Sequence, residues 1–184
     1  MERNVNNYKK VSIVVPCRNE IKYIRSFIEN ILSFEYPKHL IEVLIIDGMS
    51  NDGTREVIIE YAQKYSFIKL IDNPKKIVPT ALNKGIQNST GEIIIRMDVH
   101  ALYPKNYIDR LVYYLLKLNA DNVGGCWITV PSNNSLQARA IALALSNPFG
   151  VGNARYRLKI DDNKEFIEVD TVPFGCYKKE IFEK

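Results

Sequence analysis

The chain has 184 residues, of which 46% are hydrophobic and 25% charged, a composition typical of one globular domain that excludes a disordered or fibrous protein. The 25 Lys and Arg and the 21 Asp and Glu are interleaved, without the basic stripe expected of a dedicated nucleic-acid binder. Cys17, Cys126 and Cys176 are odd in number and widely spaced, which argues against a disulfide framework or a paired zinc site and favours a reducing compartment.

No segment has the pattern of a targeting or membrane-spanning sequence. Residues 1–10 lack the apolar core of a secretory signal, and no later stretch reaches about 18 uninterrupted apolar residues. The sequence therefore predicts a cytoplasmic protein.

Short runs rich in Ile and Val alternate with amphipathic stretches through the first two thirds of the chain. The short runs predict strands at residues 11–15, 41–46, 67–71 and 92–97. Apolar positions at helical spacing predict helices at residues 21–32, 57–65, 79–87 and 108–116. Apolar strands between helices are typical of a parallel sheet covered on both faces, so the predicted class is α/β with a Rossmann-like, mostly parallel central sheet.

The pattern is weaker beyond residue 120. Residues 122–130 and 167–174 are interpreted as strands, and residues 136–145 as an Ala-rich helix. Residues 147–153 are predicted to form a loop, because they contain one Pro and two Gly. No linker or internal repeat separates these elements from the first part of the chain.

Polar side chains gather after three of the predicted strands. They occupy residues 16–20 after the first strand, 47–54 after the second and 98–100 after the fourth. Ligands of parallel α/β sheets bind beyond the carboxyl ends of the strands. The sequence therefore predicts one binding site that these three segments build together.

Asp47 ends a buried strand, where its carboxylate needs hydrogen-bond donors. The imide and hydroxyl groups of a nucleoside could supply them, and a turn or capping role is an equally open interpretation. Asp52 and Thr54 are expected to cap the second helix. Gly48 and Gly53 are expected to allow the tight turn between the strand and that helix.

Asp98 and His100 are two residues apart at the end of an apolar run. In extended chain this spacing directs both side chains to one side, so they could share one metal ion, although a lone His100 would be an ordinary loop histidine. A carboxylate with an imidazole suits Mn²⁺ better than Mg²⁺, and such an ion would bridge two phosphate oxygens and stabilise a diphosphate leaving group. Arg18, Lys84 and Arg96 are candidate helpers or else surface charges.

Three kinds of isolated residue are given structural interpretations. Trp127 is predicted to lie in the core rather than to form a sugar platform, and Cys17 to be a small buried residue rather than a nucleophile. Packing in a helical segment is expected to explain most of the nearby tyrosines, namely Tyr103, Tyr107, Tyr113 and Tyr114.

Four motifs in order resemble family-two glycosyltransferases with the GT-A fold: Val11–Glu20, Val43–Thr54, Ala81–Ile86 and Gly91–His100. Three further segments are similar to exopolysaccharide enzymes of the succinoglycan-biosynthesis type: Asp98–Pro104, Asn147–Ala154 and Val169–Gly175. The resemblance covers residues 10–184 and implies an inverting, metal-dependent enzyme that takes a sugar from a UDP-sugar donor.

The resemblance also implies site residues. The nucleotide-sugar-binding positions are Pro16, Arg18, Glu20, Asp47, Asn83, Lys84 and Asp98, with Asp47 near the base or ribose. Asp98 and His100 hold the cofactor, a divalent metal that is Mn²⁺ or Mg²⁺. The chain departs from the family pattern at His100, where an acidic residue is usual, and at Leu82, where many members have arginine.

The resemblance divides the chain into a tail at residues 1–10, a nucleotide-sugar-binding half at 11–118 and the start of an acceptor-binding half at 119–184. It implies transfer to a glycan or lipid-linked acceptor in polysaccharide biosynthesis, with peripheral contact at the inner face of the membrane and no nucleic-acid partner. The catalytic base is expected to be an acidic residue beyond Lys184. Four carboxylates near that region are interpreted as surface groups: Asp161, Asp162, Glu165 and Asp170.

Other functions stay open. A fragment of this kind could bind a UDP-sugar without transferring it. A sugar nucleotidyltransferase also uses a parallel sheet with a metal-binding carboxylate, but residues 16–20 lack the glycine-rich, basic loop expected there. A dinucleotide-dependent oxidoreductase would need Gly-x-Gly-x-x-Gly after the first strand, and this sequence has none there.

Overall fold

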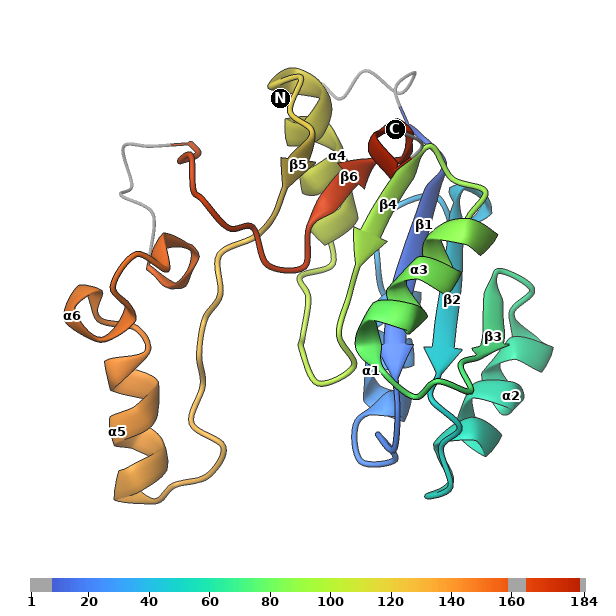
Figure 1. The fold of residues 1–184 in the computed structure, drawn as a ribbon, viewed down its shortest axis with the longest axis horizontal. Coiled ribbons are helices and arrows are strands. Elements are labelled where there is room, and N and C mark those ends of the chain that lie inside the picture. Colours follow the sequence, from blue (N-terminus) through green and yellow to red (C-terminus); the bar gives the residue numbers. More distant parts are fainter. Residues whose placement is uncertain (1–7, 159–164, 183–184) are drawn as a thin grey trace. The chain divides into compact units, whose positions relative to one another are not determined.

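A computed structural model describes residues 8–158 and 165–182 of the chain (Figure 1). They form two compact units. The first unit combines Met1–Val123 with Phe174–Lys184, and the second is Gly124–Pro173. The compact units describe how the chain packs and not what each part binds. The functional division expected between residues 118 and 119 therefore stays a prediction.

The first unit contains a six-stranded sheet in the order β3-β2-β1-β4-β6-β5. Its strands are β1 (Val11–Cys17), β2 (Ile41–Asp47), β3 (Ile68–Asp72), β4 (Ile93–Arg96), β5 (Asn122–Val123) and β6 (Cys176–Lys178). β1 to β4 are parallel, with Val11 opposite both Ile41 and Ile93, whereas β6 runs antiparallel to β4 and β5. The mostly parallel α/β sheet predicted from the sequence is therefore confirmed.

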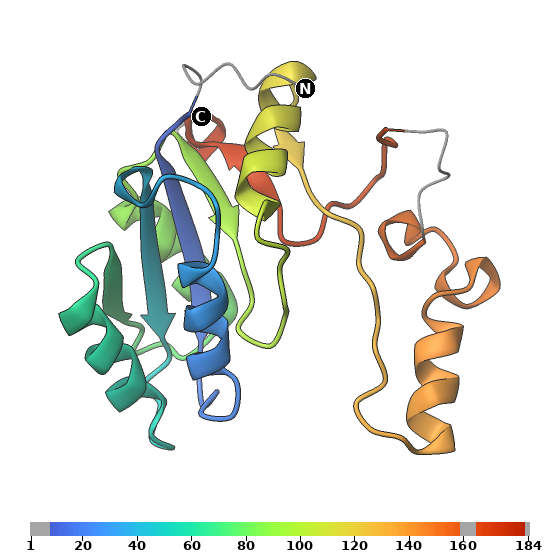
Figure 2. The ribbon, with the colours of Figure 1, turned by 180° about the vertical axis from the view of Figure 1, so that it is seen from behind.

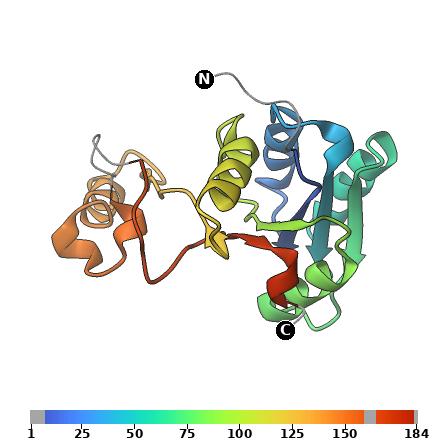
Figure 3. The same ribbon diagram turned by 90° about the horizontal axis from the view of Figure 1, so that it is seen from above.

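Helices cover both faces of this sheet. They are α1 (Ile24–Leu32), α2 (Thr54–Lys64), α3 (Val78–Asn88) and α4 (Tyr107–Lys117), with short 3₁₀ turns at Lys38–Leu40 and Lys179–Phe182. α3 lies in front of the sheet in Figure 1, and α1, α2 and α4 lie on the opposite face, which Figure 2 turns toward the reader. Figure 3 shows the same layers edge-on.

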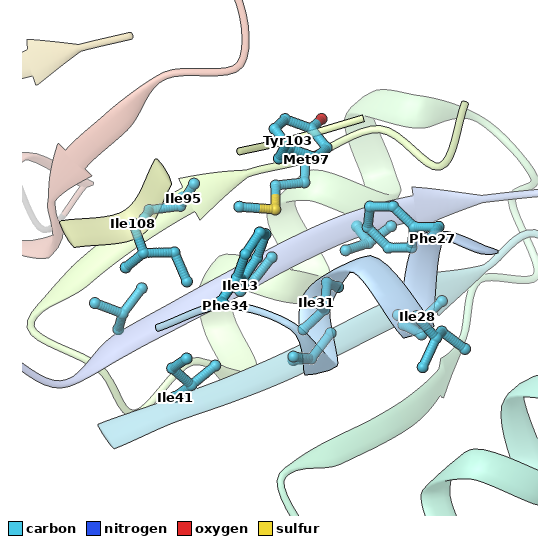
Figure 4. Packing of buried hydrophobic residues seen from close by; sticks show 14 of the residues in the cluster. Ile13, Phe27, Ile28, Ile31, Phe34, Ile41, Ile95, Met97, Tyr103 and Ile108 are labelled. Carbon is cyan, nitrogen blue, oxygen red and sulfur yellow. The ribbon is translucent and has the colours of Figure 1, made fainter. Parts of the chain in front are cut away.

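The larger core lies between the sheet and helices α1, α2 and α4. Figure 4 shows Ile13 of β1 near Ile31 of α1, with Phe27 of the same helix, and Ile95 of β4 beside Ile108 of α4. All five side chains are buried. Full burial of such side chains is worth roughly 1.5–3 kcal/mol each, so this layer accounts for much of the stability of the domain.

The smaller core lies under α3 and depends on a glycine. A Cβ atom at Gly85 would lie 2.2 Å from Val14 Cγ1 and 3.1 Å from Ile46 Cδ1, so the helix packs directly on the sheet at this point. The glycine in the third motif is thus explained by close packing of helix and strand.

We expect Gly85→Ala to destabilise the protein by about 1–3 kcal/mol, because overpacking outweighs the better helix propensity of alanine. The free energy of unfolding, measured in urea, checks this. Gln87→Ala, at an exposed position of α3, is the matched control and should be neutral or stabilising. Equal stability of the two variants would contradict the close packing.

Two predictions beyond residue 120 were wrong about strands. The strand expected at 122–130 stops at Val123, because a strand persists only where a neighbour pairs with it and β5 pairs with β6 alone. The strand expected at 167–174 is absent, and the chain re-enters the sheet at Cys176, which is fully buried opposite Ile95.

The second unit holds α5 (Leu136–Ala144), α6 (Pro148–Val151) and a 3₁₀ turn at Arg155–Arg157. The prediction of a loop at 147–153 was wrong in part, because α6 lies within it. The Asn147 side chain accepts a hydrogen bond from Phe149 N–H and Pro148 takes the first helical position, which is a common start of a helix. No helix within residues 8–158 and 165–182 is long and apolar enough to cross a bilayer.

Candidate functional site

An open pocket lies at the carboxyl ends of the parallel strands, the edge to which the arrowheads of β1 and β2 point in Figure 1. Residues that follow β1, β2, β3 and β4 line it together with the start of α3. Five of the predicted site residues are in this lining: Pro16, Arg18, Glu20, Asp98 and His100. Asp47, Asn83 and Lys84 are not.

The chain after β4 bends at the candidate metal residues. β4 ends at Arg96, and Ala101 N–H donates to the Asp98 carbonyl at 3.3 Å, which closes a turn. The expectation that Asp98 and His100 lie in extended chain was therefore wrong. The turn nevertheless brings both side chains to the pocket, and His100 Nδ1 lies 3.8 Å from Glu20 Oε1 of the loop after β1.

Asp98 is held from two sides. Its carboxylate pairs with Arg96, whose Nε lies 3.2 Å from Oδ1, and its backbone N–H donates to the Tyr103 hydroxyl at 2.9 Å. Burial raises the pKa of Tyr103 well above its ordinary value, outweighing that amide hydrogen bond, so the hydroxyl stays neutral. Tyr103 precedes α4 rather than lying in a helix, and no sequence pattern predicted its contact with Asp98.

Asp47 finds its hydrogen-bond donors within the protein. Its side chain is 0% exposed and accepts bonds from Ser50 N–H at 3.0 Å, from the Ser50 hydroxyl and from Arg55 Nη1 at 2.6 Å. Arg55 Nη1 also lies 2.9 Å from Asp72 Oδ1 at the end of β3. The hydrogen bonds that Arg55 donates to Asp47 and Asp72 raise its pKa, so it stays protonated between them.

The other basic candidates differ in their surroundings. Lys84 Nζ donates to the Asp72 carbonyl at 2.7 Å, and Asn83 is exposed on α3. The Arg96 guanidinium lies 5.4 Å from the centre of the Phe174 ring as well as beside Asp98. Of the three proposed helpers, Arg18 is the one that lines the pocket.

The metal prediction rests on two protein ligands. Within residues 8–158 and 165–182, no three His, Cys, Asp or Glu side chains are grouped closely enough to form a metal site by themselves. Asp98 and His100 offer one carboxylate and one imidazole to the pocket, with Glu20 beside His100. This donor set fits a borderline divalent ion that takes its other ligands from a bound diphosphate.

The isolated residues are mostly structural. Cys17 is buried, as predicted, and burial together with the nearby Asp47 raises the pKa of its thiol far above the ordinary value. The prediction that Trp127 lies in the core was wrong: it is half-buried, and in the second unit its ring packs against Tyr156 and lies 4.7 Å from the Arg157 guanidinium. Asp170 accepts a hydrogen bond from Asn153 Nδ2 at 2.8 Å, and Glu165 is exposed. Asp161 and Asp162 lie outside the described residues.

Solved structures identify the fold class. The mannosyltransferase PcManGT from Pyrobaculum calidifontis, determined with GDP-Man and Mn²⁺, matches with a TM-score of 0.67 and 22% identity over 97% of this chain and 47% of its own. S. aureus TarS with UDP-GlcNAc matches with a TM-score of 0.66 and 17% identity over 95% of this chain and 46% of its own. The chain therefore has the GT-A glycosyltransferase fold.

The family follows from the sequence. The model of glycosyl transferase family 2 matches residues 12–184, and the chain belongs to that family. The succinoglycan biosynthesis protein ExoA of Rhizobium meliloti is 35% identical over 147 residues, which cover 79% of this chain and 44% of ExoA. The dolichyl N-acetyl-alpha-D-glucosaminyl phosphate 3-beta-D-2,3-diacetamido-2,3-dideoxy-beta-D-glucuronosyltransferase of Methanococcus voltae is 30% identical over 95% of this chain and 54% of its own length. The chain thus spans about half the length of these relatives.

Proposed function

We propose that this chain binds a nucleotide-diphosphate sugar, with UDP as the nucleotide, and forms the donor-binding part of an inverting glycosyltransferase. The observation that carries the proposal is the meeting of Arg18 and Glu20 with Asp98 and His100 in one pocket of a family 2 chain. Two proteins of the same fold were solved with GDP-Man and Mn²⁺ and with UDP-GlcNAc, which supports a nucleotide-sugar donor for this chain.

The pocket residues have separable roles in this proposal. The Arg18 guanidinium neutralises a phosphate, and its stem packs over Gly48, where an added Cβ would meet Arg18 Cδ at 3.0 Å. Glu20 accepts hydrogen bonds from ribose hydroxyls or orients the His100 imidazole. Asp98 and His100 hold the divalent ion, which when bound neutralises charge on the diphosphate leaving group. Asp47, Asn83 and Lys84 do not line the pocket.

The reaction we propose is one displacement at the anomeric carbon. The oxygen of an acceptor hydroxyl forms the new bond as the bond to the diphosphate oxygen breaks, and the hydroxyl proton passes to a carboxylate base in the acceptor-binding part. The acceptor is a glycan or lipid-linked glycan, reached at the inner face of the membrane, as suits relatives in succinoglycan and dolichyl-phosphate chemistry. Binding can be tested on this chain separately from transfer.

Calorimetric titration with UDP and GDP, each with Mn²⁺, Mg²⁺ or EDTA, tests the donor site. We expect UDP with Mn²⁺ to bind most tightly, and chelation to weaken binding by roughly 100-fold, which corresponds to about 2.7 kcal/mol. Circular dichroism under the same conditions verifies that the protein is folded. A folded protein that binds neither nucleotide would overturn the proposal, and tighter binding of GDP would change the donor class.

A further inference from the structure

The loop after β1 is held by the loop after β2 through consecutive backbone amides. Asn19 N–H donates to Ser50 Oγ at 2.8 Å, Glu20 N–H to Thr54 Oγ1 at 2.8 Å, and Ile21 N–H to Asp52 Oδ2 at 3.1 Å. These amides precede α1 and have no partner of their own within that helix. In the reverse direction, Asn51 N–H donates to Asn19 Oδ1 at 3.0 Å, so the two loops bind each other reciprocally.

Two of these contacts are relays that end on carboxylates. The Ser50 hydroxyl donates to Asp47 Oδ1 while it accepts from Asn19 N–H. The Thr54 hydroxyl donates to Asp52 Oδ1 at 2.6 Å while it accepts from Glu20 N–H. Because each hydroxyl has one proton and gives it to a carboxylate, only its lone pairs can face the amide. The carboxylates therefore fix the direction of both relays.

Further contacts hold both ends of the Ser50 relay, at Asp47 and at Asn19. Asp47 is itself fixed by Arg55, which bridges it to Asp72 of the neighbouring strand. Asn19, at the other end, has a left-handed φ of 55°, a conformation that needs support from its surroundings. This residue lies between Arg18 and Glu20, so its backbone conformation decides where those two pocket side chains point.

We propose that Asp47, Ser50, Asp52, Thr54 and Arg55 are positioning residues, which bind the loop of residues 18–21 and act on the donor through Arg18 and Glu20 rather than by touching it. The inference rests on the proposed function. It gives Asp47 a role that agrees with its fully buried side chain, in place of the nucleoside contact that the family resemblance implied. Residues 47–55 would then hold the pocket loop in place, while residues 18–21 bind the ligand.

The Thr54 variants test this proposal most sharply. Thr54→Val keeps the volume of a fully buried side chain but removes both hydrogen bonds of the hydroxyl, whereas Thr54→Ser keeps them. We expect Thr54→Val to weaken binding of UDP with Mn²⁺ by about 10-fold, and Thr54→Ser to stay within about 2-fold of the wild type. Amide exchange followed by NMR should quicken at Asn19 and Glu20 in the valine variant, but not at Val14 within β1.

Thr90→Val is the control, because its hydroxyl also donates to a carboxylate, that of Glu42 at the far end of β2. It should leave nucleotide affinity unchanged. Wild-type affinity in Thr54→Val, with faster exchange at Glu20, would overturn the positioning role. If the wild-type protein binds neither nucleotide, the proposed function fails, and exchange alone then decides whether the loop is held: unchanged protection of Glu20 in Thr54→Val would overturn the relay as well.

Discussion

Replacing Asp98 and His100 together by alanine should remove the Mn²⁺-dependent part of UDP binding. A bound divalent ion stabilises phosphate charge by several kcal/mol, so we expect affinity in Mn²⁺ to fall by roughly 100-fold, or about 2.7 kcal/mol. The residual affinity should equal that of the wild-type protein in EDTA. Calorimetric titration of both proteins, each with and without Mn²⁺, measures the difference.

A matched control shows whether the effect comes from the position of the two residues in the pocket or from the loss of one Asp and one His anywhere in the chain. His39 and Asp121 are exposed, so a double alanine variant at these positions makes the same chemical change outside the pocket lining. It should bind UDP like the wild type. If the variant at Asp98 and His100 keeps its response to Mn²⁺, then the ion binds elsewhere and the metal site proposed here is incorrect.

Glu42→Ala should be among the most destabilising single substitutions in the sheet. The buried Glu42 carboxylate accepts bonds from the Ser12 hydroxyl, from the N–H and hydroxyl of Thr90, and from Lys69 Nζ at 3.2 Å. The Ser12 hydroxyl in turn accepts Gly91 N–H at 2.8 Å, so one carboxylate joins β1 and β2 to the start of β4. We expect a loss of about 2–4 kcal/mol in the free energy of unfolding, because buried donors are left without acceptors.

The Glu42 carboxylate also makes the free energy of unfolding depend on pH. Burial alone would raise the pKa of Glu42, but the bonds from Ser12, Thr90 and Lys69 outweigh it and lower the pKa to about 2 from an ordinary value of 4.5. A carboxylate with a depressed folded-state pKa contributes fully above the unfolded value and loses its contribution as the pH falls toward the folded one. Stability should therefore decline between about pH 4.5 and about pH 2.

Urea unfolding across this pH range checks the prediction. Glu42→Gln keeps an oxygen for Ser12 and Thr90 but cannot ionise, so it should remove this part of the acid response at a smaller cost than alanine. Glu92→Gln, which removes an exposed partner of Lys9, is the control and should change stability by no more than about 0.5 kcal/mol. An unaltered acid response in Glu42→Gln would contradict the assignment.

The parallel part of the fold could be predicted because each of its strands is a short run rich in Ile and Val, which can be recognised without knowing its neighbours. Val11–Cys17 and Ile41–Asp47 are buried along almost their whole length, and a strand in that position is mostly apolar. The antiparallel edge could not be predicted in the same way. β5 and β6 are short and exist because they pair with each other and with β4, which is information about distant parts of the chain.

The candidate site divides along similar lines. Arg18 and His100 were predictable because polar residues that follow parallel strands must meet at one edge of the sheet. Tyr103 and Arg55 were not, since their partners depend on how the chain turns back toward Asp98 and on how α2 approaches Asp47. Asp47 illustrates the limit: its place at the end of an apolar strand marked it as a candidate, but the sequence did not reveal that Ser50 and Arg55 supply its hydrogen-bond donors.

The pairing of β5 with β6 has a consequence for how such proteins diversify. Val123 lies opposite Cys176, so the entire segment Gly124–Pro173 leaves and rejoins the sheet through adjacent strands. The entropy of closing such an excursion rises only slowly with its length, so the segment can grow, shrink or be exchanged while the register of the sheet is preserved. Related chains of this fold can therefore differ in the segment between β5 and β6 while the parallel strands that line the pocket stay the same.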